Sequence, residues 1–294
     1  MISILLFRTD RVGDFLLSLS LIKNIKKNHP NSKITIVASQ QNFDYIKSFD
    51  EVDHVINLNN NIVSKIILIF KLRSINYDWI IVHDGKSRSK FISYFLKYKK
   101  RVVCINNLID SQYDIIRNTC DKLNLTFDKD CLNFLDKRKN KSIKIPFNEY
   151  IQLHFDEKWI YDLFNKKYNK IEPTLDQLAS FIDKLLLKSK NVIITTGSRK
   201  LKILDKVDEL FKDKNVKIIQ NQNLQDLECI VFDANLLITC HGWISHIASA
   251  KKIKQVDIID QSYPYNKWTS HFRNYNSVYR KSFNILSEEI LKLV

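Results

Sequence analysis

Short apolar runs alternate with amphipathic stretches along most of the chain, and this alternation restricts the fold more than any other feature. Runs typical of buried strands are expected at residues 1–7, 33–38, 54–58, 79–83, 101–105, 191–196, 216–219, 236–239 and 256–259. The segments between most of these runs have the periodicity of helices. Strands that alternate with helices form parallel sheets covered by helices on both faces. The sequence therefore predicts an α/β protein with doubly wound parallel sheets.

A polar segment near the middle of the chain divides this pattern. Residues 126–150 are rich in charged side chains, contain Pro146 and break the alternation. We interpret them as the linker region between two Rossmann-like domains, residues 1–147 and residues 148–294. Doubly wound domains bind ligands beyond the carboxyl ends of their strands, so we expect the two domains to face a ligand-binding cleft.

The composition is that of a globular protein. The 294 residues are 45% hydrophobic and 27% charged, enough for two domains of ordinary size. The five cysteines show no paired spacing, which favours a reducing compartment and argues against a zinc site. Residues 1–7 are too short for a secretory signal, and no apolar run approaches the roughly 20 residues that span a bilayer. We therefore expect a cytoplasmic protein that is at most peripheral to the inner membrane.

The positive charge is concentrated in the first half. The net charge is +15, of which residues 1–147 contribute +11, from 25 Lys and Arg against 14 Asp and Glu. This bias favours an anionic partner such as a glycolipid or a phospholipid surface, although lysines scattered over solvated faces give the same count. Two basic clusters are candidates for that contact: Lys23, Lys26 and Lys27, and Lys97, Lys99, Lys100 and Arg101. No known nucleic-acid-binding pattern is present, so we expect no nucleic-acid partner.

The stretch 236–250 carries the clearest signal for a binding site. An expected strand ends at Thr239, a turn follows, and residues 243–250 have the pattern of a helix. The start of a helix presents unpaired N–H groups and the positive end of the helix dipole, which suit a diphosphate. The candidate phosphate-binding residues are His241, Gly242 and His246. An ordinary strand-to-helix turn with two incidental histidines fits this stretch equally well.

A second candidate phosphate site follows the expected strand 191–196. Hydroxyl groups, backbone N–H groups and a cation come together there in Thr195, Thr196, Gly197 and Lys200. The stretch lacks the G-x-x-x-x-G-K-[ST] pattern of a P-loop. Asp128 and Asp130 have the D-x-D spacing of a metal site, but they lie in the linker region and are interpreted as a solvated turn.

Polar residues and glycines also follow two expected strands of the first half. Arg8, Asp10, Arg11, Gly13 and Asp14 come after the first of these strands, and Asp84 and Gly85 come after strand 79–83. The carboxylate of Asp14 would either cap the following helix or accept a proton from an attacking hydroxyl group. Glycine after a parallel strand allows a tight turn or the close approach of a ligand.

These motifs together resemble glycosyltransferase family 9, the bacterial heptosyltransferase-like enzymes. Residues 8–14 are similar to the family's R-x-D-x-x-G-D start. Residues 77–89 look like its glycine-bearing central strand segment, and residues 236–250 look like its nucleotide-sugar segment. The chain departs from the family where Asp-Thr-Gly is replaced by His241-Gly242-Trp243. That change puts the identity of the donor sugar in doubt.

The resemblance implies a GT-B fold, with the acceptor on the first domain and a nucleotide-sugar donor on the second. It implies sugar transfer with inversion, without a metal and without a cofactor, onto a glycan or an anionic glycolipid of lipopolysaccharide or another surface polysaccharide. Asp14 matches the catalytic base, and Thr195, Thr196 and Lys200 match phosphate-contacting positions. His246 matches the motif histidine, and Arg8, Asp10, Arg11, Gly13, Asp84 and Gly85 lie on the acceptor side.

Other functions remain open for the same residues. A nucleotide-sugar epimerase or hydrolase would use a similar fold. A catalytically inactive nucleotide- or glycan-binding protein is the alternative from another class, and the altered motif at residues 241–243 keeps it open.

Overall fold

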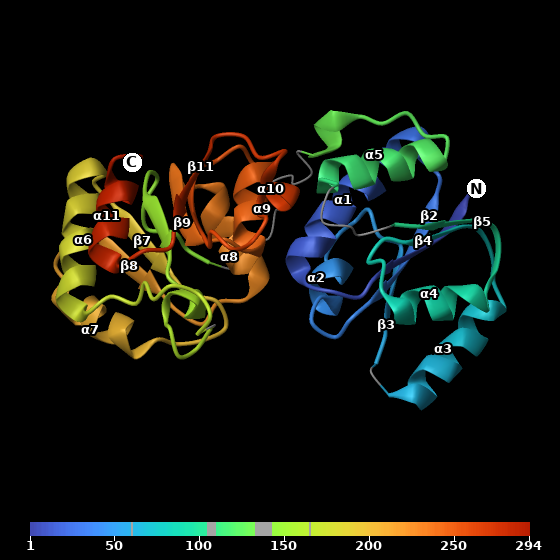
Figure 1. Ribbon diagram of the computed structural model, residues 1–294, viewed down its shortest axis with the longest axis horizontal. Coiled ribbons are helices and arrows are strands. Elements are labelled where there is room, and N and C mark those ends of the chain that lie inside the picture. The colour runs from blue at the N-terminus through green and yellow to red at the C-terminus, as the bar shows by residue number, and fades with distance from the viewer. Residues whose placement is uncertain (60, 105–109, 133–142, 165) are drawn as a thin grey trace. The chain divides into compact units, whose positions relative to one another are not determined.

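The computed structural model describes residues 1–59, 61–104, 110–132, 143–164 and 166–294 (Figure 1). The chain forms two compact units, each built on one parallel sheet. The first unit is Met1–Phe134 with Asn266–His271, and the second is Leu135–Tyr265 with Phe272–Val294. This division falls earlier than the expected boundary at 147/148, and the short α10 (Asn266–Thr269) belongs to the first unit. The cleft expected between the domains stays a prediction.

The first unit contains a five-stranded parallel sheet with the strand order β3-β2-β1-β4-β5. Its strands are β1 (Ser3–Arg8), β2 (Lys33–Ala38), β3 (His54–Asn57), β4 (Asn76–Val82) and β5 (Lys97–Val103). Its helices are α1 (Val12–Asn28), α2 (Phe43–Lys47), α3 (Ile62–Arg73), α4 (Ser87–Tyr94) and α5 (Gln112–Lys122), followed by the 3₁₀ helix η1 (Lys129–Leu132).

Successive strand residues of the first sheet point to opposite faces, and apolar side chains cover both faces. Leu5, Phe7, Ile80 and Val82 pack under α3 and α4. Side chains of the opposite parity point to the other face, where the hydroxyl group of Ser18 on α1 bonds to His83 Nδ1 at 2.7 Å, and α5 packs beside α1. Figure 1 shows α1 and α5 on one side of the sheet and α3 and α4 on the other.

The second unit contains a six-stranded parallel sheet with the strand order β11-β10-β9-β6-β7-β8. Its strands are β6 (Ile151–His154), β7 (Val192–Thr195), β8 (Val216–Ile219), β9 (Leu236–Cys240), β10 (Lys254–Ile259) and β11 (Tyr275–Tyr279). Its helices are η2 (Glu157–Trp159), α6 (Leu175–Lys188), α7 (Lys202–Leu210), α8 (Leu224–Phe232), α9 (Trp243–Ala250) and α11 (Phe283–Leu291). Helices α6, α7 and α11 cover one face, and α8 contributes to the apolar cluster on the other.

The strands β6 and β11 and the helices α5, α10 and α11 were not expected from the sequence. The sequence favours a helix around Trp159, but this residue ends the short 3₁₀ helix η2, which follows β6. β6 lacks the continuous apolar run that predicts a buried strand, because two of its four residues, Gln152 and His154, are polar. Both are nevertheless buried, and both bond to the hydroxyl group of Thr195 on β7, at 3.0 Å and 2.9 Å.

Candidate functional site

The expected phosphate-binding turn lies at the carboxyl end of β9, near the centre of the second sheet. β9 ends at Cys240, Gly242 is the N-cap of α9, and the helix begins at Trp243, as the sequence predicted. β6 and β10 flank β9, so the segments after all three parallel strands meet at the same edge of the sheet. The amino end of α9, with the positive end of its dipole, therefore points to this edge.

A buried carboxylate holds His241 in place. The Nδ1 atom of His241 is 2.5 Å from Oδ2 of Asp257, a fully buried residue of β10. The other oxygen of Asp257 accepts a hydrogen bond of 2.8 Å from the hydroxyl group of Ser245 on α9. With Asp257 ionised, Nδ1 of His241 carries the proton, which leaves Nε2 to bind a partner.

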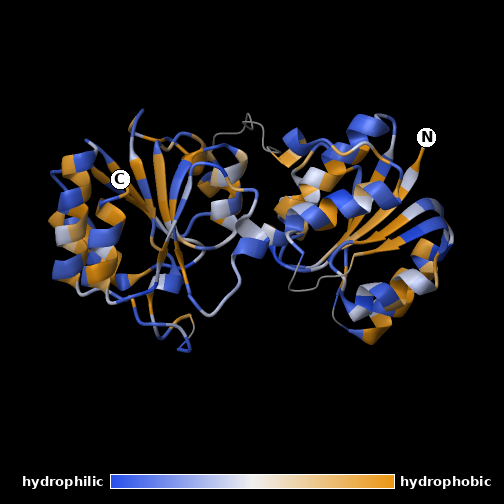
Figure 2. Cartoon of the chain, turned by 45° about the horizontal axis from the view of Figure 1, so that its top comes forward, coloured by the Kyte–Doolittle hydropathy of each residue, from blue (hydrophilic) through white to orange (hydrophobic). Residues whose placement is uncertain are grey.

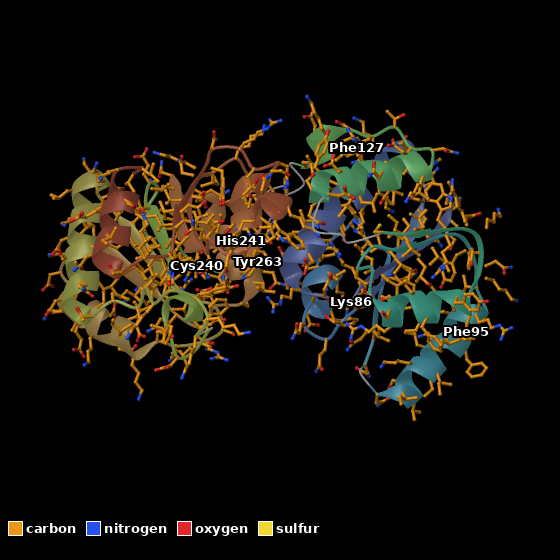
Figure 3. The ribbon with its side chains drawn as sticks, in the orientation of Figure 1. Lys86, Phe95, Phe127, Cys240, His241 and Tyr263 are labelled. Atoms are coloured by element: carbon orange, nitrogen blue, oxygen red, sulfur yellow. The ribbon has the colours of Figure 1, made fainter. Side chains whose placement is uncertain are left out.

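Aromatic rings surround the imidazole of His241. Its ring centroid is 4.8 Å from that of Tyr265 and 6.4 Å from that of Phe272. The buried ring of His246 lies 5.7 Å from His241 and 5.2 Å from Phe272. Figure 3 labels Cys240, His241 and Tyr263, and Tyr263 in turn contacts Tyr265 with centroids 4.8 Å apart. The structure thus brings His241, Gly242 and His246 together, with His241 partly exposed and His246 buried.

Lys158, which the sequence did not single out, lies at the same edge. Its ammonium group is 2.9 Å from Oδ2 of Asp156 and donates to the carbonyl oxygen of Cys240 at 3.2 Å. Burial opposes both charges, but each partner stabilises the other: the pKa of Lys158 lies above its ordinary value and that of Asp156 well below. The ammonium group is therefore charged at neutral pH. Arg280 fixes this segment by donating to the carbonyl oxygen of Lys158 at 2.7 Å.

Gly242 lies directly against this lysine, and its backbone conformation does not call for glycine. Its φ of −176° is extended and open to any residue. A Cβ atom at this position would lie 2.4 Å from Nζ of Lys158, closer than real contacts allow. The absence of a side chain therefore lets a cation lie directly against the start of α9, where an anionic ligand would meet both.

At the second expected phosphate site, the threonine hydroxyl groups are buried and already form hydrogen bonds within the protein. Thr195 and Thr196 are fully buried, and the hydroxyl group of Thr195 is occupied by Gln152 and His154. That of Thr196 accepts from the backbone N–H of Asn221 at 2.9 Å. Gly197 is half-buried and Lys200 is exposed beyond it. The threonines thus support the fold, and their role as phosphate contacts stays a prediction.

In the first unit, the loop after β1 is held by a network of charged groups. The buried guanidinium of Arg8 donates to Asp10 at 3.2 Å and to the carbonyl oxygens of Asp14 and His83 at 2.8 and 3.2 Å. Burial raises the pKa of Asp10 to about 6, helped by the carboxylates of Asp14 and Asp84 and opposed by Arg8. The Oδ1 atom of Asp10 is buried without a hydrogen-bond partner. Asp10 therefore titrates close to neutrality.

Asp14 lies in the first turn of α1, as the sequence predicted. Its Oδ2 atom accepts a hydrogen bond of 3.2 Å from the backbone N–H of Arg11, so it does cap the helix. The side chain is half-buried, and Arg11 is exposed. Gly13 lies inside the first turn of α1 and not in the loop before it. Capping by one oxygen leaves the other oxygen available for a proton, so the role as base stays a prediction.

Asp84 ties the end of β4 to the loop after β1. Its Oδ2 atom accepts from the hydroxyl groups of Thr9 at 2.6 Å and Ser89 at 2.7 Å, and Arg88 donates to the Thr9 carbonyl oxygen at 2.5 Å. Gly85 follows with φ of +61°, a conformation that favours glycine. Lys86, labelled in Figure 3, donates to the carbonyl oxygen of Thr9 at 3.3 Å. Asp84 thus orders the loop after β1, and its own carboxylate is buried away from solvent.

Within the described residues, no helix is long and apolar enough to cross a membrane. The same residues contain no group of three or more His, Cys, Asp or Glu side chains placed to hold a metal ion. Asp128 accepts from Lys27 and from the backbone N–H of Asp130, so this D-x-D pair serves the turn at η1. Burial raises the pKa of Cys240 to about 12, so its thiol stays protonated.

No protein-family model and no curated protein matches the sequence. Solved structures do match. Escherichia coli heptosyltransferase WaaC with ADP is 12% identical, with full coverage of both chains and a TM-score of 0.71. A family 9 glycosyl transferase from Veillonella parvula is 13% identical over 99% of this chain and 88% of that chain, with a TM-score of 0.70. UDP-GlcNAc 2-epimerase from Methanocaldococcus jannaschii is 14% identical over 99% and 91%, with a TM-score of 0.60.

These similarities define the class of fold. The two Rossmann-like parallel-sheet units are those of GT-B proteins, and the fold expected from the sequence is confirmed. Glycosyltransferases and a nucleotide-sugar epimerase share this fold, so the activity must be argued from the site.

Proposed function

We propose that this protein is a glycosyltransferase of the family 9 type, which transfers a sugar from a nucleotide-sugar to a glycan or glycolipid in lipopolysaccharide or other surface-polysaccharide synthesis. One observation carries the proposal: the charged ammonium group of Lys158 and the carboxylate-held His241 both lie at the start of α9. A lysine, an imidazole and a helix N-terminus together suit a diphosphate. WaaC, whose fold is similar, was solved with ADP.

The diphosphate is the leaving group of the proposed reaction. Negative charge develops on it as the bond to the sugar breaks, and preorganised donors in a partly buried site stabilise that charge. Lys158 supplies a cation, Nε2 of His241 supplies a hydrogen bond when protonated, and α9 supplies its dipole. These groups take the role that a metal ion has in other transferases, so we propose metal-independent transfer.

Asp14 is the proposed base on the acceptor side. It removes the proton of the acceptor hydroxyl, whose oxygen attacks the anomeric carbon of the donor as the nucleoside diphosphate leaves. A single displacement of this kind inverts that carbon. Asp10 lies in the same network with a pKa of about 6, and its charge holds Arg8 against the loop. The acceptor, its glycolipid nature, and a cytoplasmic location peripheral to the inner membrane belong to this proposal.

Epimerisation is the second candidate function, because the fold of a UDP-GlcNAc 2-epimerase is also similar. An epimerase needs no acceptor and converts the donor alone. An inactive binding protein would hold the nucleotide-sugar unchanged.

A thermal-shift screen of the full chain against nucleotide-sugars and nucleoside diphosphates tests the donor site. We expect at least one of these ligands to raise the melting temperature. We expect Lys158→Met to reduce that shift and Lys200→Met, an exposed lysine of the same unit, to leave it unchanged. A shift that depends on Lys200 and not on Lys158 would move the phosphate site to the end of β7.

A further inference from the structure

Helix α3 is apolar on two opposite sides. Leu68 and Leu72 are buried against the sheet. On the other side, Ile62, Ile67 and Phe70 expose 73, 60 and 69% of their surface. An ordinary surface helix of a soluble protein presents charged residues there, and a helix that is apolar all round normally has a partner on each side. The outer side of α3 therefore has the character of a binding surface.

The neighbouring helix α4 extends this surface. Phe91, Tyr94 and Phe95 are exposed, and their rings contact one another at centroid distances of 5.0 and 5.7 Å. Helices α3 and α4 cover the same sheet face, and Figure 2 shows hydrophobic residues on both of them. We call these exposed residues the α3–α4 patch: Ile62, Val63, Ile66, Ile67, Phe70, Phe91, Tyr94 and Phe95.

The surroundings of the patch are strongly basic. Residues 61–101 hold ten Lys and Arg but two Asp and Glu, a difference of +8 within a net charge of +15 for the whole chain. Neither acid is a free surface charge. Asp78 pairs with Lys99 at 2.7 Å, and Asp84 is buried in the network at Thr9. An exposed apolar patch within a basic field is complementary to an anionic surface that has an apolar interior.

The other basic cluster of the first half differs because each of its three lysines lies close to an acidic side chain. Lys23 lies 3.5 Å from Glu51, Lys26 lies 3.1 Å from Asp53, and Lys27 pairs with Asp128. Its charges are balanced by acidic residues of the first unit. Of the two clusters expected from the sequence, the one at Lys97–Arg101 adjoins the α3–α4 patch.

We propose that the α3–α4 patch is the surface by which this protein lies on an anionic phospholipid bilayer. The aliphatic and aromatic side chains enter the interface between headgroups and acyl chains, and Lys65, Lys71, Arg73, Lys90 and Lys97 meet the headgroup phosphates. Aromatic residues such as Tyr94 are favoured at that depth. The inference deepens the proposed function, because it gives a membrane-borne acceptor a defined docking surface.

Vesicle sedimentation of the full chain tests the proposal without donor or acceptor. We expect binding to phosphatidylglycerol-containing vesicles to exceed binding to phosphatidylcholine vesicles by at least about 30-fold, since each basic residue near the surface contributes about fivefold. High salt should weaken the binding. The variant Ile67→Asp/Phe70→Asp should bind anionic vesicles at least about tenfold more weakly.

A matched control carries the same charge change elsewhere. Leu187→Asp/Leu210→Asp replaces two exposed leucines of the second unit and should bind as the wild type does. Equal binding to both vesicle types, or equal losses in both double variants, overturns the proposal. A dimer that Ile67→Asp/Phe70→Asp abolishes, seen by sedimentation velocity without any vesicle binding, also overturns it and assigns the patch to a second copy of the chain. Nucleotide binding is measured separately, so either proposal can fail alone.

Discussion

Replacing Lys158 by methionine separates the structural and functional roles of the ion pair at the end of β6. Nζ of Lys158 and Oδ2 of Asp156 are 2.9 Å apart, and their side chains are 17% and 5% exposed. Removing one partner of a buried pair costs about 3–5 kcal/mol, because the remaining charge is left unpaired in the interior. Because the Lys158 side chain is 17% exposed, solvent screens part of its charge, and we expect a loss of about 2–3 kcal/mol.

The same substitution should weaken donor binding. Losing one hydrogen bond to a charged group costs about 1.5–3 kcal/mol, which corresponds to roughly a 10- to 150-fold rise in the Kd for the nucleotide-sugar. Urea unfolding at pH 7 measures the stability, and calorimetric titration with the ligand found by thermal shift measures the affinity.

The double variant Asp156→Asn/Lys158→Met is the decisive comparison. It leaves no unpaired charge, so it should recover at least half of the lost stability while donor binding stays weak. If the double variant is as unstable as the single one, the pair is not the cause of the loss. If Lys158→Met binds the donor within about threefold of wild type, a difference of less than 1 kcal/mol, the lysine does not contact the diphosphate.

Four further changes have defined outcomes. Gly242→Ala should displace Nζ of Lys158 and raise the donor Kd about tenfold, with little change in unfolding free energy because φ is extended; unchanged affinity would contradict this. Asp14→Asn should lower kcat about 10²- to 10⁴-fold and preserve donor binding by titration, and transfer within about threefold of wild type would reject it as the base. The pKa of Asp10 is raised by burial to about 6, so its ionisation disfavours the folded state, and its own contribution to stability should fall as the pH rises from about 4 to 6. Denaturation at both pH values should show Asp10→Asn gaining roughly 2–3 kcal/mol relative to wild type over that range, whereas a constant difference would argue against the shift. Transfer activity should persist in excess EDTA, and activity restored only by Mg²⁺ or Mn²⁺ would show that a metal stabilises the leaving group.

The sequence predicts the fold well because the strands are mostly continuous apolar runs. β1, β2, β9 and β10 are buried on both sheet faces and could be recognised without knowledge of their neighbours. β6 could not be recognised, because Gln152 and His154 become acceptable in a core strand only when the Thr195 hydroxyl of β7 lies opposite. The residues next to β6 in the sequence do not indicate that Thr195 will lie opposite.

The missed strand explains the missed lysine. Because the sequence predicts no strand at residues 151–154, it does not place Lys158 after a central strand, and Lys200 is the cation that it offers for the site. The sequence does contain one signal for this part of the site. The charged pair Asp156 and Lys158, with a tryptophan beside it, follows shortly after a short strand. Asp257 was hidden for another reason: it lies within an apolar strand, and only the fold brings it to His241.

The central claim is that the protein transfers a sugar to an acceptor. The most direct measurement is mass spectrometry of glycolipid or glycan acceptors after incubation with the nucleotide-sugar that gives the largest thermal shift. We expect an acceptor that gains the mass of one sugar residue, with an equal amount of nucleoside diphosphate released in wild type and little in Asp14→Asn. An unmodified acceptor together with an epimerised or hydrolysed donor would contradict the claim, and would assign the site to chemistry on the nucleotide-sugar alone.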